Sequence, residues 1–118
     1  MPKDEMEFFA VSKIPWKPVS GMIGVSEKIL SRDAESGSYT RLLKLKRGAI
    51  IPELLTHEFW EEVYIIDGSL TDKRKKRTFT KGMYACRPPK MQHGPYVSRP
   101  GCVTIEMRYY PERYRGST

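Results

Sequence analysis

Two histidines and one glutamate are the residues of this chain best suited to do chemistry together. His57 precedes Glu61 by four positions, and His93 follows a Pro-Pro pair later in the chain. The 118 residues contain no other histidine. Two imidazoles and one carboxylate form the ligand set of non-haem Fe(II) oxygenases, which leaves positions open for substrate, and the same set also holds other divalent metals. The pattern therefore predicts a metal site made by His57, Glu61 and His93.

Short strands, rather than helices, are expected to position these side chains. Period-two alternation over residues 39–46 places Tyr39, Arg41, Leu43 and Leu45 on one face, and nine glycines and nine prolines punctuate the chain. An Asp-Gly pair at 67–68 favours a hairpin turn. Such spacing is typical of an all-β sandwich or barrel, in which ligands from several strands converge on the interior. The other predicted strands are 8–11, 23–31, 63–66, 70–80, 83–87, 96–98 and 102–110.

The same segments resemble the two cupin motifs. The first, G-x5-H-x-H-x3-E-x6-G, is matched in its second half by His57, Glu61 and Gly68, and the second, G-x5-P-x-G-x2-H, is matched by residues 82–93. The resemblance covers about residues 38–110. It implies an all-β fold, a double-stranded β-helix or jelly-roll cupin barrel of the RmlC-like type, which is usually dimeric.

The chain departs from the first motif at one ligand position. The motif's first histidine falls on Leu55, its opening glycine is most nearly Gly48, one residue out of register, and Lys90 replaces the second glycine of the second motif. Two interpretations stay open: His57, Glu61 and His93 still bind a divalent metal, or the barrel has lost it. The resemblance favours Fe(II), with Mn, Ni, Co or Zn as alternatives.

Three further residues lie close enough in the sequence to be considered as ligands. Glu53 and Gln92 are candidates to replace the missing histidine. Glu62, next to Glu61, is expected on the opposite face of its strand, because successive side chains alternate.

Two residues are candidate catalytic groups, Arg41 and Tyr84. Arg41 shares the predicted interior face, where it would clamp a substrate carboxylate or enolate or else form an intramolecular ion pair. Tyr84, within the second motif, could donate a proton or hydrogen bond. Phe59 and Trp60, between two predicted ligands, could roof a pocket for a small, partly apolar ligand or simply pack in the core.

The last predicted strand carries a polar alternation. Thr104, Glu106 and Arg108 share one face, opposite Val103 and Ile105. We expect an Arg–Glu pair on the surface, and the alternative is a second shell that orients the histidines.

Composition indicates one cytoplasmic domain. Apolar residues make up 39% and charged residues 30% of the chain, and no apolar run approaches the ~20 residues of a membrane span. The predicted domain is 1–118, with a core at about 20–110, an arm at 1–7 and a tail at 111–118. The N-terminus lacks the apolar stretch of a secretory signal.

The net charge indicates which partners to expect, and the two cysteines indicate whether a disulfide forms. Much of the formal charge of +7 comes from the run Lys73–Arg77. A solvated hairpin is the favoured interpretation of this run, over a patch for nucleic acid or another polyanion, because no aromatic residues interleave. Cys86 and Cys102 are expected to be buried free thiols rather than a disulfide.

Three functions follow as hypotheses. The resemblance implies a metal-dependent dioxygenase acting on an enolisable or phenolic small molecule, in a homodimer. The alternative is a non-catalytic binding or sensing module, like the cupin domains of regulators, which the missing ligand at Leu55 favours. Nucleic-acid binding through Lys73–Arg77 is a weaker third hypothesis.

Overall fold

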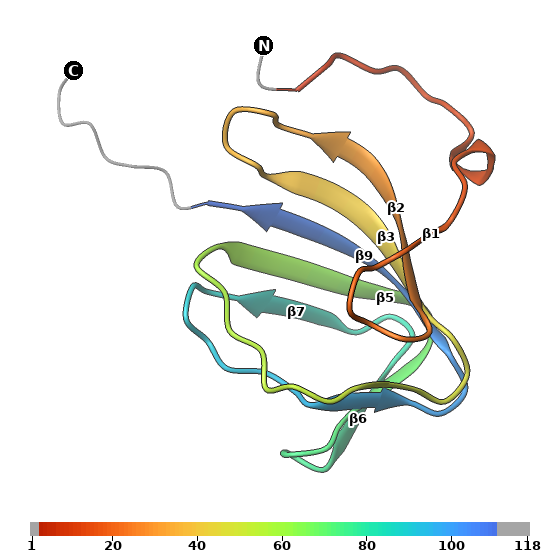
Figure 1. The fold of residues 1–118 in the computed structure, drawn as a ribbon, viewed down its shortest axis with the longest axis vertical. Helices are drawn as coiled ribbons and strands as arrows, with labels where there is room; N and C mark the ends of the chain where they lie inside the picture. The colour runs from red at the N-terminus through yellow and green to blue at the C-terminus, as the bar shows by residue number, and fades with distance from the viewer. Residues whose placement is uncertain (1–2, 111–118) are drawn as a thin grey trace, which may run out of the picture.

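The computed structural model describes residues 3–110 and shows an all-β architecture, which confirms the predicted fold class. One antiparallel sheet runs in the order β1-β2-β3-β9-β5-β8-β4, with β6 and β7 also paired to β5. It curls over so that its two ends form facing layers (Figure 1). No helix in the described part of the chain is long and apolar enough to cross a membrane. The strands are β1 Lys17–Pro18, β2 Val25–Arg32, β3 Tyr39–Leu45, β4 Ala49–Ile51, β5 Trp60–Asp72, β6 Arg77–Thr80, β7 Tyr84–Arg87, β8 Tyr96–Ser98 and β9 Cys102–Tyr109.

The long strand β5 joins the two layers. Its first half pairs with β7 and β9, its second half pairs with β6 and β8, and the register shifts between Ile65 and Asp67. Gly68 has φ +77°, and a Cβ there would collide with the carbonyl oxygen of Gly101. Because the backbone approaches so closely, only glycine fits this bend. The predicted hairpin turn at 67–68 is therefore wrong: the Asp-Gly pair bends a strand that continues to Asp72.

The space between the layers holds the core, which is apolar at one end and charged at the other. Leu43 and Leu45 are buried on the predicted face of β3, and Arg41 on that same face is also buried, at 5% exposure. Thr104 and Glu106 of β9 are buried too, so the surface placement expected for their face is wrong. The alternation of apolar and polar residues predicts the wrong buried face there, because a polar strand face can be buried when its charged side chains are paired in the interior. The buried apolar cluster comprises Val25, Leu43, Leu45, Ala49, Ile51, Ile65, Leu70, Tyr96 and Cys102.

Two local predictions are wrong, that of a strand at residues 8–11 and that of a buried Cys86. The predicted strand 8–11 is an extended segment that leads into the short 3-10 helix Val11–Lys13, because β1 is what pairs with the edge of β2. Cys86 is exposed, whereas Cys102 is buried, and both thiols are free. Within β7, alternation turns Ala85 and Arg87 inward opposite Val63 and Glu61, which leaves Cys86 on the outer face.

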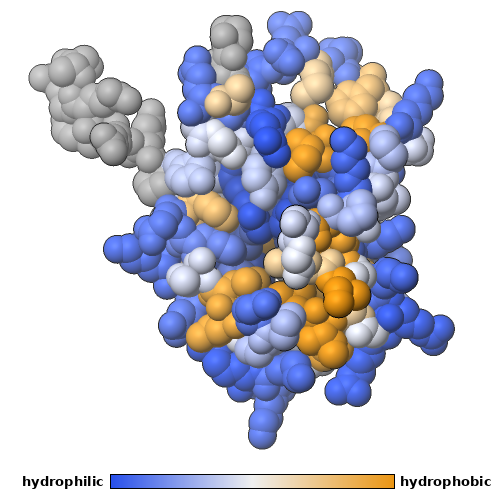
Figure 2. Space-filling view, in the orientation of Figure 1, coloured by the Kyte–Doolittle hydropathy of each residue, from blue (hydrophilic) through white to orange (hydrophobic). Residues whose placement is uncertain are grey.

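The basic run forms the predicted hairpin. Residues 73–76 make the turn between β5 and β6, and all of Lys73–Arg77 are exposed. Asp72 accepts the backbone N–H groups of Arg74 and Lys75 at 2.9 and 2.8 Å, which fixes the turn. The lower end of the surface is correspondingly hydrophilic (Figure 2).

Candidate metal centre

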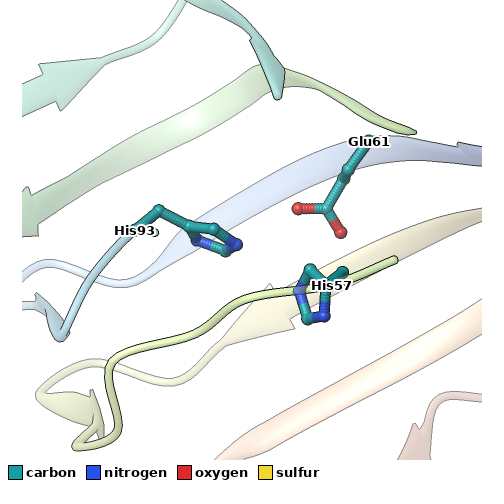
Figure 3. Close-up of side chains that lie close together, drawn as sticks. All are labelled: His57, Glu61 and His93. Atoms are coloured by element: carbon teal, nitrogen blue, oxygen red, sulfur yellow. The ribbon is translucent and has the colours of Figure 1, made fainter. Parts of the chain in front are cut away.

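The fold brings the three predicted ligands together. His57 lies on the loop between β4 and β5, Glu61 is the second residue of β5, and His93 lies on the loop between β7 and β8. Their ligand atoms all lie within 4.8 Å of one another. Figure 3 shows the three side chains pointing toward a common point. This is the candidate triad.

Backbone hydrogen bonds fix the two loops against each other. Leu55 and His93 form an isolated bridge with N–H···O distances of 2.8 and 3.0 Å, and the Lys90 N–H donates to the His57 carbonyl at 2.6 Å. Lys90 has φ +71°, a left-handed conformation that explains why the second cupin motif prefers glycine there. The loops are thus held close enough for the histidines to face each other.

Both imidazoles have a buried nitrogen with no partner. The Nε2 atoms of His57 and His93 make no hydrogen bond to any described residue. His93 Nδ1 lies 3.1 Å from the Tyr96 hydroxyl, and the His57 ring stacks on Phe59 with centroids 4.5 Å apart. When His93 Nδ1–H donates to Tyr96, the Nε2 lone pair is left free. Two such lone pairs beside a carboxylate fit a divalent ion.

Glu61 already has two cationic partners. Its Oε1 accepts from Arg87 Nη1 at 2.7 Å, its Oε2 accepts from Arg108 Nε at 2.6 Å, and the side chain is 2% exposed. Burial alone would raise the pKa of this carboxyl, but Arg108 and Arg87 outweigh burial and hold the pKa below its usual value. Glu61 is therefore ionised and suited to bind a metal ion. The ion would either share the carboxylate with both arginines or displace one of them.

A further ion-pair network lies behind the triad. Arg41 Nη1 contacts Glu27 at 2.6 Å and Arg41 Nε contacts Glu106 at 2.9 Å, while Arg108 Nη2 lies 3.8 Å from Glu106. The intramolecular ion pair, one of the two interpretations of Arg41, is what this geometry shows. Burial and the nearby Glu61 raise the pKa of Glu106, although Arg41 opposes this. Arg108 links this network directly to the triad through Glu61, whereas the alternative interpretation of β9 expected contacts that orient the histidines.

Two neighbouring cavities, which share five lining residues, lie beside the triad. The inner one, about 40 Å³, is lined by Glu61, His93 and Leu55 among others. The outer one, about 120 Å³, is mainly apolar. The residues that line both are Val63, Leu70, Arg87, His93 and Tyr96. A small molecule in the outer cavity would therefore lie beside His93.

Other candidates lie away from the triad. Tyr84 and Tyr109 both donate to Glu62 on the outer face of the sheet, which confirms the predicted orientation of Glu62. Glu53 and Gln92 are exposed and stand outside the cluster. Of the two aromatic residues between the ligands, Phe59 covers His57.

Sequence reasoning missed Arg87 and Tyr96. The signal for Arg87 was its place two residues after Ala85 in a strand that pairs with β5, where Glu61↔Arg87 is a cross-strand pair. The sequence alone does not give this pairing, because it depends on the register between β5 and β7.

The sequence of residues 4–109 matches the family described as the ChrR cupin-like domain. The chain belongs to that family. In the search of curated proteins, none matches it. The family match spans the triad, both loops and the whole curled sheet.

Solved structures share this cupin fold. An RmlC-like cupin from Shewanella frigidimarina superposes with a TM-score of 0.73 at 17% identity, over 96% of this chain and 97% of that one. A protein assigned provisionally as an acetylacetone dioxygenase, from Methylibium petroleiphilum, gives 0.72 at 17% identity, over 90% and 77%. Rhodobacter sphaeroides SigE in complex with the anti-sigma ChrR gives 0.65 at 22% identity, over 83% and 51%. At these identities the likeness shows the fold alone.

Leu55→His should tighten metal binding. Leu55 lines the inner cavity with Glu61 and His93, so an imidazole there adds the ligand that the cupin motif carries. We expect the dissociation constant for Co(II) to fall about tenfold, or about 1.4 kcal/mol. Leu54→His, at an exposed neighbour, is the control. An equal response of the two variants in a Co(II) titration would show that position 55 does not face the ion.

His93 in the metal-free protein should titrate far below free histidine. Burial, and then Arg87, lower its pKa to about 4. The folded state then binds fewer protons than the unfolded state between about pH 4 and 6.5, so the stability contributed by neutral His93 is lost as pH falls through that range. Imidazole NMR of the apoprotein, with His57→Gln to assign the two rings, measures the midpoint. A midpoint near 6.5 would contradict the buried environment.

Proposed function

We propose that this ChrR cupin-like chain is a metal-dependent enzyme for a small organic molecule, with dioxygenase-type chemistry. Two observations carry the proposal. The Nε2 atoms of His57 and His93 are buried and unpartnered, and these two residues and Glu61 each offer a ligand atom within 4.8 Å of the others. Burying two such nitrogens without partners costs free energy, which a bound ion would recover. The outer cavity, which His93 lines, supplies room for a ligand.

Each residue of the site has a distinct task in this proposal. His57, Glu61 and His93 would hold the ion, and the Tyr96 hydroxyl, 3.1 Å from His93 Nδ1, would orient that ring by accepting its Nδ1–H. Phe59 covers the His57 ring and excludes water from that side. When bound, a divalent ion, with Fe(II) favoured, supplies Lewis-acid catalysis for an enolate or phenolate oxygen and the capacity to activate O2.

Oxygen consumption tests the reaction class. Protein reconstituted with Fe(II) should consume O2 and convert an enolisable diketone, a hydroxyketone or a phenol, and conversion should stop without O2. The His93→Ala variant is the control for metal in solution. Equal conversion with and without O2 would contradict dioxygenase chemistry. The metal site would then be tested for lyase or isomerase activity.

A non-catalytic binding module is the second candidate. It is supported by the two arginines that already hold Glu61 and by Leu55 at a motif ligand position. This candidate predicts saturable ligand binding to the metal-loaded protein with no turnover under any atmosphere.

A further inference from the structure

The buried charges around the triad balance without any ion. Three arginines and three glutamates form one connected set of ion pairs. Their formal charges cancel, and His57 and His93 add none when they act as ligands, because an imidazole must be neutral to bind a metal ion. The members of the set are Arg41, Arg87 and Arg108 with Glu27, Glu61 and Glu106.

A divalent ion at the triad would add two positive charges to this balanced interior. Only one other carboxylate, Asp72, lines either cavity among residues 3–110, and it is committed to the turn of the β5–β6 hairpin. An uncompensated buried charge is strongly unfavourable, so negative charge is needed from outside the chain. The natural source is a ligand in the adjoining cavity.

Arg87 stands where such a ligand would meet the site. Its Nη1 donates to Glu61 and its Nη2 donates to the Tyr96 hydroxyl at 2.8 Å, with the side chain 12% exposed. It lines both cavities, whereas Arg108 lines only the inner one and is also bound to Tyr39. Val63, Ile65, Leu70 and Phe79 supply an apolar wall beside Arg87 in the outer cavity.

We propose that the ion and a small carboxylate with an apolar body bind to this centre together, and that Arg87 holds the carboxylate. The inference rests on the proposed metal site and names its ligand class. Glu61 turns from Arg87 toward the ion, and the released guanidinium takes the ligand's carboxylate in a charge-assisted hydrogen bond. Arg87 is thus a specificity residue that selects an anion over a neutral molecule of the same shape.

Benzoate and benzamide test the proposal on the unaltered protein, because they share a shape and differ in charge. Co(II) affinity is measured first by titration, with the free ion held by a metal buffer. We expect benzoate to bind the Co(II)-loaded protein about tenfold more tightly than benzamide, and more tightly than it binds the apoprotein. By linkage, benzoate should tighten Co(II) binding by the same factor by which Co(II) tightens benzoate binding.

Arg87→Gln should move the two affinities in opposite directions. Without the arginine, Glu61 loses a competing cation and Co(II) binds more tightly, while the preference for benzoate over benzamide disappears. A merely structural role would weaken both. Arg87→Lys should restore part of the benzoate preference, and Arg47→Gln, at an exposed position, should change neither affinity.

The outcomes separate this inference from the proposed function. No Co(II) binding at the triad would overturn both. Co(II) binding with equal affinities for benzoate and benzamide, or with no benzoate binding, would overturn this inference and leave the metal site standing. Benzoate binding that is independent of Co(II) would also overturn it, since the charge argument requires the ion. The comparison on the unaltered protein remains decisive if Arg87→Gln does not fold.

Discussion

Replacing His57 or His93 with alanine lowers the affinity for Co(II) or Zn(II) by about a hundredfold or more and leaves the sheet folded. Each change removes one of three ligand atoms that lie within 4.8 Å of one another. Losing one of three protein ligands costs several kcal/mol of binding, and a hundredfold loss corresponds to about 2.7 kcal/mol. The imidazoles make few hydrogen bonds, so truncation leaves a small cavity rather than an unpaired charge.

Competition titration against a metal indicator measures this loss, with circular dichroism to verify the fold. Adjacent glutamates supply a matched control. Glu61→Ala should weaken metal binding strongly, whereas Glu62→Ala should not, because Glu62 faces outward to Tyr84 and Tyr109. Equal losses at the two glutamates would contradict the assigned register of β5. Unchanged affinity in both histidine variants would remove the triad as a metal site.

Arg41→Met destabilises the protein by about 3–5 kcal/mol. The change leaves Glu106, whose side chain is 7% exposed, and Glu27, at 25%, without their shared cation. Breaking a buried ion pair from one side costs this much because a buried charge is left uncompensated. Urea denaturation compares the free energies of unfolding.

Two further variants show whether charge is the cause. Arg41→Met combined with Glu106→Gln should recover part of the loss, since the carboxylate that loses Arg41 is then replaced by a neutral amide. Arg47→Met, at an exposed position, should stay within about 0.5 kcal/mol of the unaltered protein. A loss below about 1 kcal/mol for Arg41→Met would mean that water or a side-chain shift compensates the two glutamates.

The triad could be predicted from the sequence because the spacing within each of its two motifs is local. His57 and Glu61 lie on either side of one short turn, and His93 follows a loop whose motif fixes its length. The interior face of β3 was equally predictable, since four alternating residues mark it. Motif spacing and strand alternation are properties of short segments, so a sequence displays them directly.

The partners of the triad could not be predicted, because cross-strand register decides them. Arg87 and Arg108 meet Glu61 only because β7 and β9 flank β5 at that point. The same register turned Glu106 inward against Arg41 and left Cys86 outside. The bend at Gly68 could not be predicted for a similar reason, since it depends on the close approach of Gly101, which lies just before β9 and far away in the sequence. A charged residue that is buried in a cross-strand ion pair is predicted to be exposed when only its own segment of the sequence is considered.

Metal analysis of the unaltered protein tests the central claim most directly. The protein is purified without a histidine tag or chelator, loaded with Fe(II), Co(II) or Zn(II), desalted and measured by elemental analysis beside His57→Ala. The triad predicts about one ion per chain in the unaltered protein and almost none in the variant. No retained ion in the unaltered protein, or equal amounts in the two, would contradict a metal centre at His57, Glu61 and His93.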